Sequence, residues 1–446
     1  MRILVVGAKK SGVYASILAK QRGSDVFLTE YSLNEEIEEM EGLLKKEGVP
    51  YEVGGHSYDK FYNFDLAVLS PGVPLNSPVV KALEERHIPY VGELEFAFRY
   101  SPPKTRVIAI TGTNGKSTTT ALVGHILETA HMDVVTGGNL GTPYSALLLA
   151  HPEPAYAVLE ISCFQLETID RFHPHIAVFL NFTEDHLDRY RNVEEYLHYK
   201  KRIFENQKKS DYAVLNIDDD TVRGFSSELE QEVYFFSTKG SLKKGAYYKN
   251  GAIYFSDGNS FKILDRDLIP LRGMHNVENV LSAVVASYLA GVKFEDIKDG
   301  ITTFEGLPHR LEYVRTLSDV IYVNDSKSTT PDSTIKALES FNGRVVLIAG
   351  GSSKNSDFAN LAKLFPSKLK ALVLIGETAP ELARAAISNG FEKYFFATSL
   401  EEAVFIARGE AEGGDVVLLS PACASFDMFR DFEERGEEFK RIVEGL

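Results

Sequence analysis

Residues 106–118 of the chain read Arg-Val-Ile-Ala-Ile-Thr-Gly-Thr-Asn-Gly-Lys-Ser-Thr. The apolar run predicts a buried strand, and a helix is predicted to begin near Lys116. Between them, glycines let the backbone curl so that several N–H groups point inward, and the helix start adds partial positive charge. Lys116 would reach the terminal phosphates of a nucleotide and Ser117 would bind Mg²⁺. Ile110 stands where the longer form of this motif has glycine, so the match is to Gly-x-x-Gly-Lys-Ser.

A neighbouring strand of the same region is predicted to end in a carboxylate. The apolar run 155–159 is followed directly by Glu160. Because the carboxyl ends of parallel strands meet at one edge of a sheet, we expect Glu160 to face the phosphate loop. A carboxylate in that place would bind Mg²⁺ or its water. The alternative is a solvated glutamate at a strand end.

Polar groups also follow the strand predicted at residues 176–180. Residues 181–188 read Asn-Phe-Thr-Glu-Asp-His-Leu-Asp and gather oxygen atoms and an imidazole at the same sheet edge. We expect His186 to bind metal or to contact a substrate. Thr183 or Asp185 would serve equally well to cap a helix.

Short apolar runs alternate with helical patterns along most of the chain. The main predicted strands are residues 2–6, 26–28, 66–69, 106–110, 155–159, 176–180, 212–215, 345–349, 372–375 and 416–419. Unbroken apolar strands that alternate with helices are typical of parallel sheets covered on both faces. Residues 232–271 differ, because short Tyr, Phe and Ile runs are broken by Gly and Asn, and they predict antiparallel hairpins. A helix is predicted near residues 276–289.

Two proline-containing stretches, residues 101–104 and 306–308, are candidate domain boundaries. The chain of 446 residues is long enough for about three domains. We therefore predict an α/β protein with domains at 1–101, 102–307 and 308–446. Rossmann-like domains at both ends would flank a central P-loop ATPase-like domain with a small antiparallel portion.

A second glycine turn, Gly7-Ala8-Lys9-Lys10-Ser11-Gly12, follows the first strand. It lacks the Gly-x-Gly-x-x-Gly spacing of a dinucleotide site, but the start of its helix can still hold a phosphate. Residues 70–72, Ser-Pro-Gly, end another strand on the side where open sheets bind ligands. For both turns, a simple connection without a ligand stays open.

Composition narrows the class of protein. The net charge is −15, which argues against sequence-independent nucleic-acid binding and against an anionic membrane surface. Two cysteines are too few for a disulfide framework and suit a reducing compartment. No apolar run is long enough to predict a spanning helix, and no secretory signal is predicted. We expect a cytoplasmic protein.

Residues 199–204, Tyr-Lys-Lys-Arg-Ile-Phe, fit a helix. By themselves they indicate a basic face in contact with solvent, with Lys200 as one of several surface cations.

Taken together, these motifs resemble the Mur ligases of bacterial cell-wall synthesis over nearly the whole chain. The segments that carry the resemblance are residues 111–118, 160–166, 183–189, 275–279, 307–310, 324–327 and 420–427. Phe164-Gln165-Leu166 and the stretch 420–439 favour the branch of the family that adds D-glutamate over its sister ligases.

The resemblance implies an ATP-dependent amide ligase that adds D-glutamate to UDP-N-acetylmuramoyl-L-alanine in peptidoglycan synthesis. ATP would convert the carboxylate of the UDP substrate into an acyl phosphate, and the amine of D-glutamate would displace phosphate. Two Mg²⁺ ions are implied as cofactors. The partners would be these small molecules, with no nucleic acid and no membrane, and we expect a monomer.

The resemblance also assigns roles to individual residues. Those implied for ATP are Thr113, Asn114, Gly115, Lys116, Ser117, Thr118, Thr119, Asn276, Arg310 and Asp325. Those implied for the UDP substrate are Ser11, Thr29, Glu30, Ser70 and Gly72, with Asn139, Ser162, Gln165 and His186 at its muramoyl-alanine end. Those implied for D-glutamate are His186, Thr329, Lys354, Ser425 and Phe432. The catalytic and metal-binding set is Lys116, Ser117, Glu160, His186 and Lys200.

For Lys200 the resemblance reverses the interpretation as a surface cation. The matching lysine of the family is carbamylated and helps to bind Mg²⁺, and a carbamate supplies anionic oxygens where an ammonium would be repelled. The chain also departs from the family pattern. Thr29-Glu30 stands where an aspartate is common, and Cys163 replaces a serine.

Other functions remain open at this point. A sister Mur ligase or a folylpolyglutamate synthase would share the motifs and differ in substrate. A nicotinamide-dependent oxidoreductase would use the first α/β domain, although its glycine spacing argues against that. A P-loop regulatory ATPase would hydrolyse ATP without a small-molecule product.

Overall fold

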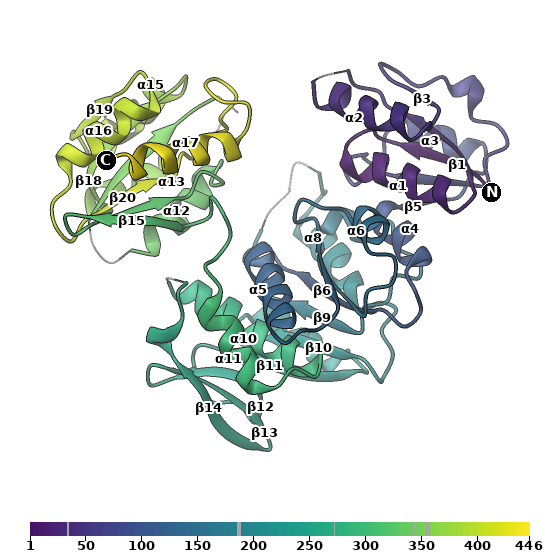
Figure 1. Ribbon diagram of the computed structural model, residues 1–446, viewed down its shortest axis with the longest axis horizontal. Coiled ribbons are helices and arrows are strands. Elements are labelled where there is room, and N and C mark those ends of the chain that lie inside the picture. The colour runs from purple at the N-terminus through teal and green to yellow at the C-terminus, as the bar shows by residue number, and fades with distance from the viewer. Residues whose placement is uncertain (34, 185–188, 272, 342–343, 353–356) are drawn as a thin grey trace. The chain divides into compact units, whose positions relative to one another are not determined.

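A computed structural model describes residues 1–33, 35–184, 189–271, 273–341, 344–352 and 357–446 (Figure 1). The chain forms two compact units. The first comprises Met1–Pro270 and His275–Phe304, and the second comprises Leu271–Met274 and Glu305–Leu446. The first unit contains two β-sheets and the second contains one.

The first sheet is parallel, with the strand order β3-β2-β1-β4-β5. Its strands are β1 (Arg2–Val6), β2 (Asp25–Thr29), β3 (Tyr51–Glu52), β4 (Leu66–Leu69) and β5 (Tyr90–Gly92). Its helices are α1 (Lys10–Gln21), α2 (Glu35–Lys46), α3 (Pro78–Glu85) and α4 (Glu93–Tyr100). The sequence pattern of apolar strands that alternate with helices predicts a parallel α/β layer, and this part of the chain forms one.

The second sheet has nine strands in the order β14-β13-β12-β11-β10-β9-β6-β8-β7. Its strands are β6 (Arg106–Thr111), β7 (Val134–Gly138), β8 (Tyr156–Glu160), β9 (Ile176–Phe179), β10 (Tyr212–Asn216), β11 (Glu232–Ser237), β12 (Lys244–Lys249), β13 (Ala252–Asp257) and β14 (Asn259–Asp265). Its helices are α5 (Lys116–Thr129), α6 (Tyr144–Ala150), α7 (Cys163–Leu166), α8 (Val193–Lys201), α9 (Asp220–Gly224), α10 (Met274–Leu289) and α11 (Phe294–Thr303). Strand β6 lies between β8 and β9, so the residues that follow these three strands meet at one edge.

The prediction of antiparallel hairpins over residues 232–271 is only partly right. Strands β12, β13 and β14 pair antiparallel, as predicted. Strand β11 instead pairs parallel with both β10 and β12. The reason is the connection: helix α9 carries the chain from β10 back to the start of β11, and such a crossover places two strands parallel.

The third sheet lies in the second unit and has the order β15-β16-β20-β17-β18-β19. Its strands are β15 (Glu312–Leu317), β16 (Val320–Asn324), β17 (Val345–Gly350), β18 (Leu369–Ile375), β19 (Tyr394–Phe396) and β20 (Val416–Leu419). Its helices are α12 (Pro331–Glu339), α13 (Ala359–Ala362), α14 (Phe365–Lys368), α15 (Ala379–Ser388), α16 (Leu400–Glu410) and α17 (Phe432–Glu444). Only the β15–β16 pair is antiparallel.

Short 3-10 turns lie at Tyr58–Lys60, Arg202–Phe204, Phe225–Ser227 and Arg266–Leu268. In the part of the chain that the structure describes, no helix has both the length and the apolar character needed to cross a membrane. The α/β fold class that the sequence predicts, with three separate sheets, is confirmed.

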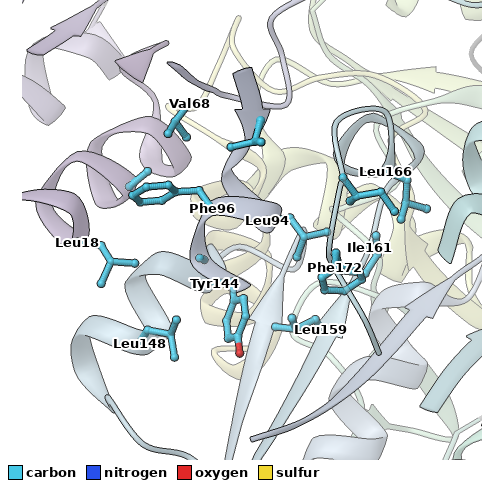
Figure 2. Close-up of a cluster of buried hydrophobic side chains, with 14 of the residues drawn as sticks. Leu18, Val68, Leu94, Phe96, Tyr144, Leu148, Leu159, Ile161, Leu166 and Phe172 are labelled. Carbon is cyan, nitrogen blue, oxygen red and sulfur yellow. The ribbon is translucent and has the colours of Figure 1, made fainter. Parts of the chain in front are cut away.

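The first two sheets share one hydrophobic core (Figure 2). Phe96 of α4 and Tyr144 of α6 are buried in the same cluster as Leu159 of β8. The buried carboxylate of Glu95 adds a polar link, because its Oε2 accepts the backbone N–H groups of residues 170–172 at 3.0, 2.9 and 2.7 Å. Helix α4 and the central sheet are thus held within one packed body.

Candidate active site

The phosphate loop joins β6 to α5 through two glycines in the left-handed region. Gly112 has φ +151° and Gly115 has φ +83°. A Cβ atom on Gly115 would lie 2.2 Å from Asn279 Oδ1, and one on Gly112 would lie 2.9 Å from Leu180 Cβ. Both positions therefore need glycine, for the backbone angle and for the close approach.

The loop is fixed by the residues that follow β9. The backbone N–H of Thr113 donates to Asn181 O at 3.0 Å, and that of Asn114 donates to Asn181 Oδ1 at 2.8 Å. The Lys116 Nζ donates to the carbonyls of Gly112 and Thr113 at 3.0 and 2.9 Å. The lysine side chain thus lies across the loop itself.

The first turn of α5 contacts helix α10. Ser117 is partly exposed there, and Thr118 and Thr119 are buried. Thr119 Oγ1 donates to Asn279 Oδ1 at 3.3 Å, and Asn279 Nδ2 donates to Asn276 Oδ1 at 3.0 Å. Asn276, which the resemblance assigns to the nucleotide, therefore lies beside the phosphate loop within the first unit.

Asn181 and Asn279 are among the residues that contact the loop and are missing from the predicted set. Each has a signal in the sequence. Asn181 follows a predicted strand directly, and Asn279 lies three residues after Asn276, on the same side of a helix.

Glu160 ends β8 at the position paired with Ile110 of β6. Its side chain is 3% exposed, and its Oε1 accepts a hydrogen bond from Asn139 Nδ2 at 2.9 Å. Its Oε2 is buried and accepts no hydrogen bond from the described residues. A buried carboxylate oxygen without a donor is costly unless a cation or water completes it, so this oxygen fits a Mg²⁺ ion beside the phosphate loop.

Lys200 is 1% exposed, which corrects the interpretation of residues 199–204 as a basic face in solvent. Its Nζ donates to Gly112 O at 2.6 Å and lies 5.0 Å from the centre of the Tyr196 ring. The helical pattern misleads because α8 turns this one lysine inward, under the phosphate loop. A buried ammonium facing a cation site is unfavourable, whereas a carbamate in this place supplies anionic oxygen.

The muramoyl-alanine residues of the predicted set lie near one another. Ser162 and Gln165 form a capping box at the start of α7, in which Ser162 N donates to Gln165 Oε1 at 2.9 Å. Both are buried, whereas Asn139 is exposed and linked to Glu160. His186 lies outside the described residues.

In the glycine turn after β1, backbone groups form hydrogen bonds with side chains of the protein itself. Glu30 Oε2 accepts the backbone N–H of Ala8 at 2.8 Å, and Ser70 Oγ donates to Gly7 O at 3.4 Å. Thr29 Oγ1 donates to Glu52 Oε1 at 2.9 Å and lies 2.7 Å from His56 Nδ1.

Burial lowers the pKa of His56, so its neutral form is favoured. Ser11, partly exposed, lies at the start of α1, and the exposed Gly72 follows β4, so the predicted uridine residues gather at one edge of the first sheet.

In the second unit, Asp325 follows β16 and is 2% exposed. Its carboxylate accepts hydrogen bonds from Ser420 Oγ at 2.7 Å and from Leu311 N at 3.1 Å. Burial raises the pKa of Asp325 to about 6. The charge of Arg310 opposes that rise, which indicates that the two predicted nucleotide residues of this unit lie near each other.

Ser425 and Phe432, two of the predicted D-glutamate residues, lie next to segments that a buried arginine connects. Arg435 is 1% exposed and donates to Ser326 Oγ and to the carbonyls of Cys423 and Ala424 at 2.9, 3.2 and 3.2 Å. Ser425 follows those carbonyls, and Phe432 begins α17, whose backbone O accepts from Ser326 Oγ at 2.8 Å.

Thr329 follows the Asp325 turn, with its N–H donating to Lys327 O at 2.9 Å. Lys354, the remaining residue of the predicted D-glutamate set, lies outside the described residues.

Comparison with known proteins matches three parts of the chain to domains of one family. Residues 110–287 match the Mur ligase middle domain, residues 309–423 match the Mur ligase glutamate ligase domain, and residues 2–79 match the MurD N-terminal domain.

Full-length relatives are considerably similar. The UDP-N-acetylmuramoylalanine–D-glutamate ligase of Acidobacterium capsulatum is 43% identical over 99% of this chain and 96% of its own length. The enzymes of that name from Thermoanaerobacter sp. and Clostridioides difficile are 43% and 40% identical, each over 100% of this chain and 98% of their own length.

Solved structures share the fold at lower identity. The UDP-N-acetylmuramate–alanine ligase of Thermotoga maritima has a TM-score of 0.63 at 20% identity and covers 100% of this chain and 99% of its own. The MurF ligase of Thermotoga maritima in complex with ADP has a TM-score of 0.59 at 18% identity and covers 94% of this chain and 95% of its own. The chain belongs to the Mur ligase family, in the branch of the UDP-N-acetylmuramoylalanine–D-glutamate ligases.

Proposed function

We propose that this protein is an ATP-dependent ligase that joins D-glutamate to UDP-N-acetylmuramoyl-L-alanine through an acyl phosphate, in peptidoglycan synthesis. The observation that carries the proposal is the buried Glu160, whose free oxygen lies at the sheet edge where the phosphate loop begins. The full-length relatives, at 40–43% identity, carry the name of that reaction.

The phosphate loop would bind ATP through its backbone N–H groups and Lys116. A free carboxylate is a poor electrophile, because its leaving group would be oxide. Transfer of the γ-phosphoryl group onto the alanine carboxylate turns that oxygen into a phosphate leaving group. Lys116 stabilises the negative charge that spreads over the phosphoryl oxygens during transfer. Asn276 lies on the α10 side of the loop, where it would contact the nucleotide.

Ser117, Glu160, His186 and a carbamylated Lys200 would hold Mg²⁺. The ion, when bound, neutralises phosphate charge. The Asn139 amide orients Glu160 by donating to Oε1, which leaves Oε2 for the cation. The carbamylation of Lys200 is a prediction, supported by its burial directly beneath Gly112. The presence of two ions is a prediction that rests on the resemblance alone.

The amine of D-glutamate must lose a proton before it attacks the acyl phosphate. His186 is a candidate to accept that proton, and Thr329, Lys354, Ser425 and Phe432 would orient the amino acid. Arg310 and Asp325, also in the second unit, would contact the nucleotide. Uridine diphosphate would bind through Ser11, Thr29, Glu30, Ser70 and Gly72. Because ATP and UDP-linked sugars are intracellular compounds, the proposed compartment is the cytoplasm. The proposed oligomeric state is a monomer.

The test measures phosphate release from ATP by the purified protein. Release should require Mg²⁺, UDP-N-acetylmuramoyl-L-alanine and D-glutamate together, with one amide product formed for each phosphate. L-glutamate, meso-diaminopimelate and a folate serve as substrate controls. ATP hydrolysis at the same rate without either co-substrate would contradict the proposal and favour a regulatory ATPase.

A further inference from the structure

The loop after β4 is linked to the central sheet by the guanidinium of Arg189. Arg189 Nη1 donates to Pro71 O at 3.3 Å, across 118 residues of chain. Pro71 lies between Ser70 and Gly72, which we propose to bind the uridine diphosphate. The contact therefore reaches the middle of a loop that we propose to bind substrate.

Arg189 is held rigidly for this contact. Its Nε and Nη2 donate to Glu167 Oε1 and Oε2 at 3.0 and 2.6 Å, so the ion pair is bidentate. The side chains are 18% and 4% exposed, and the guanidinium lies 4.2 Å from the centre of the Phe164 ring. A planar fork that is paired at two atoms and stacked on a ring has little freedom to move.

Glu167 belongs to the turn that ends α7. It is the C-cap of that helix, and Ser162 and Gln165 form the capping box at the other end. The turn has an independent support, because Arg202 Nη1 donates to Glu167 O at 2.8 Å. Helix α7 is therefore held in place, and Arg189 links its C-terminal turn to the loop after β4.

We propose that Arg189 is a positioning residue that sets the spacing between the two ends of the UDP substrate. This inference rests on the proposed function, in which Ser70 and Gly72 hold the diphosphate end and Ser162 and Gln165 hold the muramoyl-alanine end. Each of the three guanidinium nitrogens already donates to a protein oxygen. Arg189 thus acts through the loop and the helix that it joins, and not by contact with the substrate.

The prediction is specific for one substrate. Without Arg189 the loop at residues 70–72 loses its link to α7. Binding of the UDP substrate, which would span both, should therefore weaken, and its carboxylate should be misplaced. The phosphate loop is fixed by separate contacts from Asn181 and Asn279. ATP binding should therefore not change.

The test compares steady-state kinetics of Arg189→Ala and Arg189→Lys with those of the wild type. For Arg189→Ala we expect KM for UDP-N-acetylmuramoyl-L-alanine to rise about tenfold or more and kcat to fall, because small misplacements of a reacting group are costly. KM for ATP should stay within about twofold. Arg189→Lys keeps the charge but not the fork, and should be intermediate.

The matched control is Arg191→Ala, two residues along the chain. Arg191 is 86% exposed and pairs with Glu195 on its own segment. The Arg191→Ala substitution should leave all kinetic constants near those of the wild type. Glu167→Gln weakens the pair that orients Arg189 and should give a smaller defect in the same direction. The double variant should be no worse than Arg189→Ala alone, because the effect of Glu167 acts through Arg189.

Two results would overturn the inference. The first is an unchanged KM for the UDP substrate in Arg189→Ala. The second is a parallel loss of affinity for ATP and the UDP substrate together with a lower Tm, which is the signature of general unfolding. A wild-type protein without co-substrate-dependent turnover would instead contradict the proposed function, so the two failures are distinguishable.

Discussion

Two glycine turns of the first unit each join a strand to a helix, but different side chains accept hydrogen bonds from their backbone N–H groups. Residues 7–12 join β1 to α1, and residues 112–115 join β6 to α5. In the first turn, the N–H of Ala8 donates to the carboxylate of Glu30. In the second, the N–H of Asn114 donates to the neutral amide of Asn181, and Lys116 lies over the loop.

The difference shows that strand-turn-helix geometry alone does not decide which ligand a turn takes. A carboxylate at the first turn repels phosphate at short range but accepts hydrogen bonds from uracil N–H or ribose hydroxyl groups. The second turn offers a cation and a nearby buried carboxylate for Mg²⁺, and so suits a triphosphate. In the first turn the charge comes from Glu30, which follows the end of β2. In the second it comes from Lys116 at the start of α5 and from Glu160 at the end of β8.

Lys116→Ala gives the strongest test of that comparison. The first helical residue of each turn is a lysine, Lys10 in α1 and Lys116 in α5. Removal of Lys116 should lower kcat by about 10³-fold or more, because the charge on the transferring phosphoryl group is no longer stabilised. Lys10→Ala, the matched control, should change kcat by less than about twofold. Phosphate release measures both, and near-normal turnover of Lys116→Ala would remove the ATP assignment.

Lys200→Ala should lower kcat by about 10²-fold, since the group beneath Gly112 would be lost. Added short-chain carboxylates should partly restore activity, because they can occupy the space of a carbamate. Mass spectrometry of the native protein should show one CO₂ adduct. Absence of both rescue and adduct would contradict the carbamate.

Glu30→Gln tests the first turn. The amide keeps an acceptor for Ala8 N but loses the charge, so the hydrogen bonds weaken modestly. We expect KM for the UDP substrate to rise about three- to tenfold and KM for ATP to stay constant. An equal effect on both substrates would show that the two turns are not separate sites.

Asp325 gives the smallest expected effect and concerns stability. Its pKa is raised from 3.8 to about 6, so the folded protein binds more protons than the unfolded chain between these values. Its contribution to the free energy of unfolding therefore falls as pH rises through the folded-state pKa, by about 1 kcal/mol between pH 5 and pH 7.

Denaturant unfolding of the wild type and Asp325→Asn at the two pH values measures this slope. The wild type should lose stability relative to the variant as the pH rises. A difference between them that does not depend on pH would contradict the raised pKa.

The sequence predicts ten strands of the parallel sheets, because each of these is a continuous apolar run. It does not predict β3, β5, β7 or β19, which are very short or contain glycine. It does not predict the β15–β16 hairpin, whose turn residues Ser318 and Asp319 have φ +51° and +61°. Such turns usually carry Gly or Asn, so the ordinary signal is missing. Strand β11 is similar: its direction depends on the crossover through α9, and not on its own residues.

For the site, the phosphate loop and Glu160 are predictable because glycine spacing and a strand end are local features. The burial of Lys200 is not, because a helix with three consecutive basic residues gives no indication of which one faces inward. The role of Arg189 depends on contacts with residues 22 and 118 positions away in the chain, which no local pattern records.

The core that the first two sheets share has a practical consequence for dissecting the enzyme (Figure 2). A fragment cut near residue 101 would uncover Leu94 and Phe96 on one piece, and Tyr144 and Leu148 on the other. We therefore expect that the first sheet cannot be excised as a free-standing module, and that calorimetry records both sheets melting in one cooperative step.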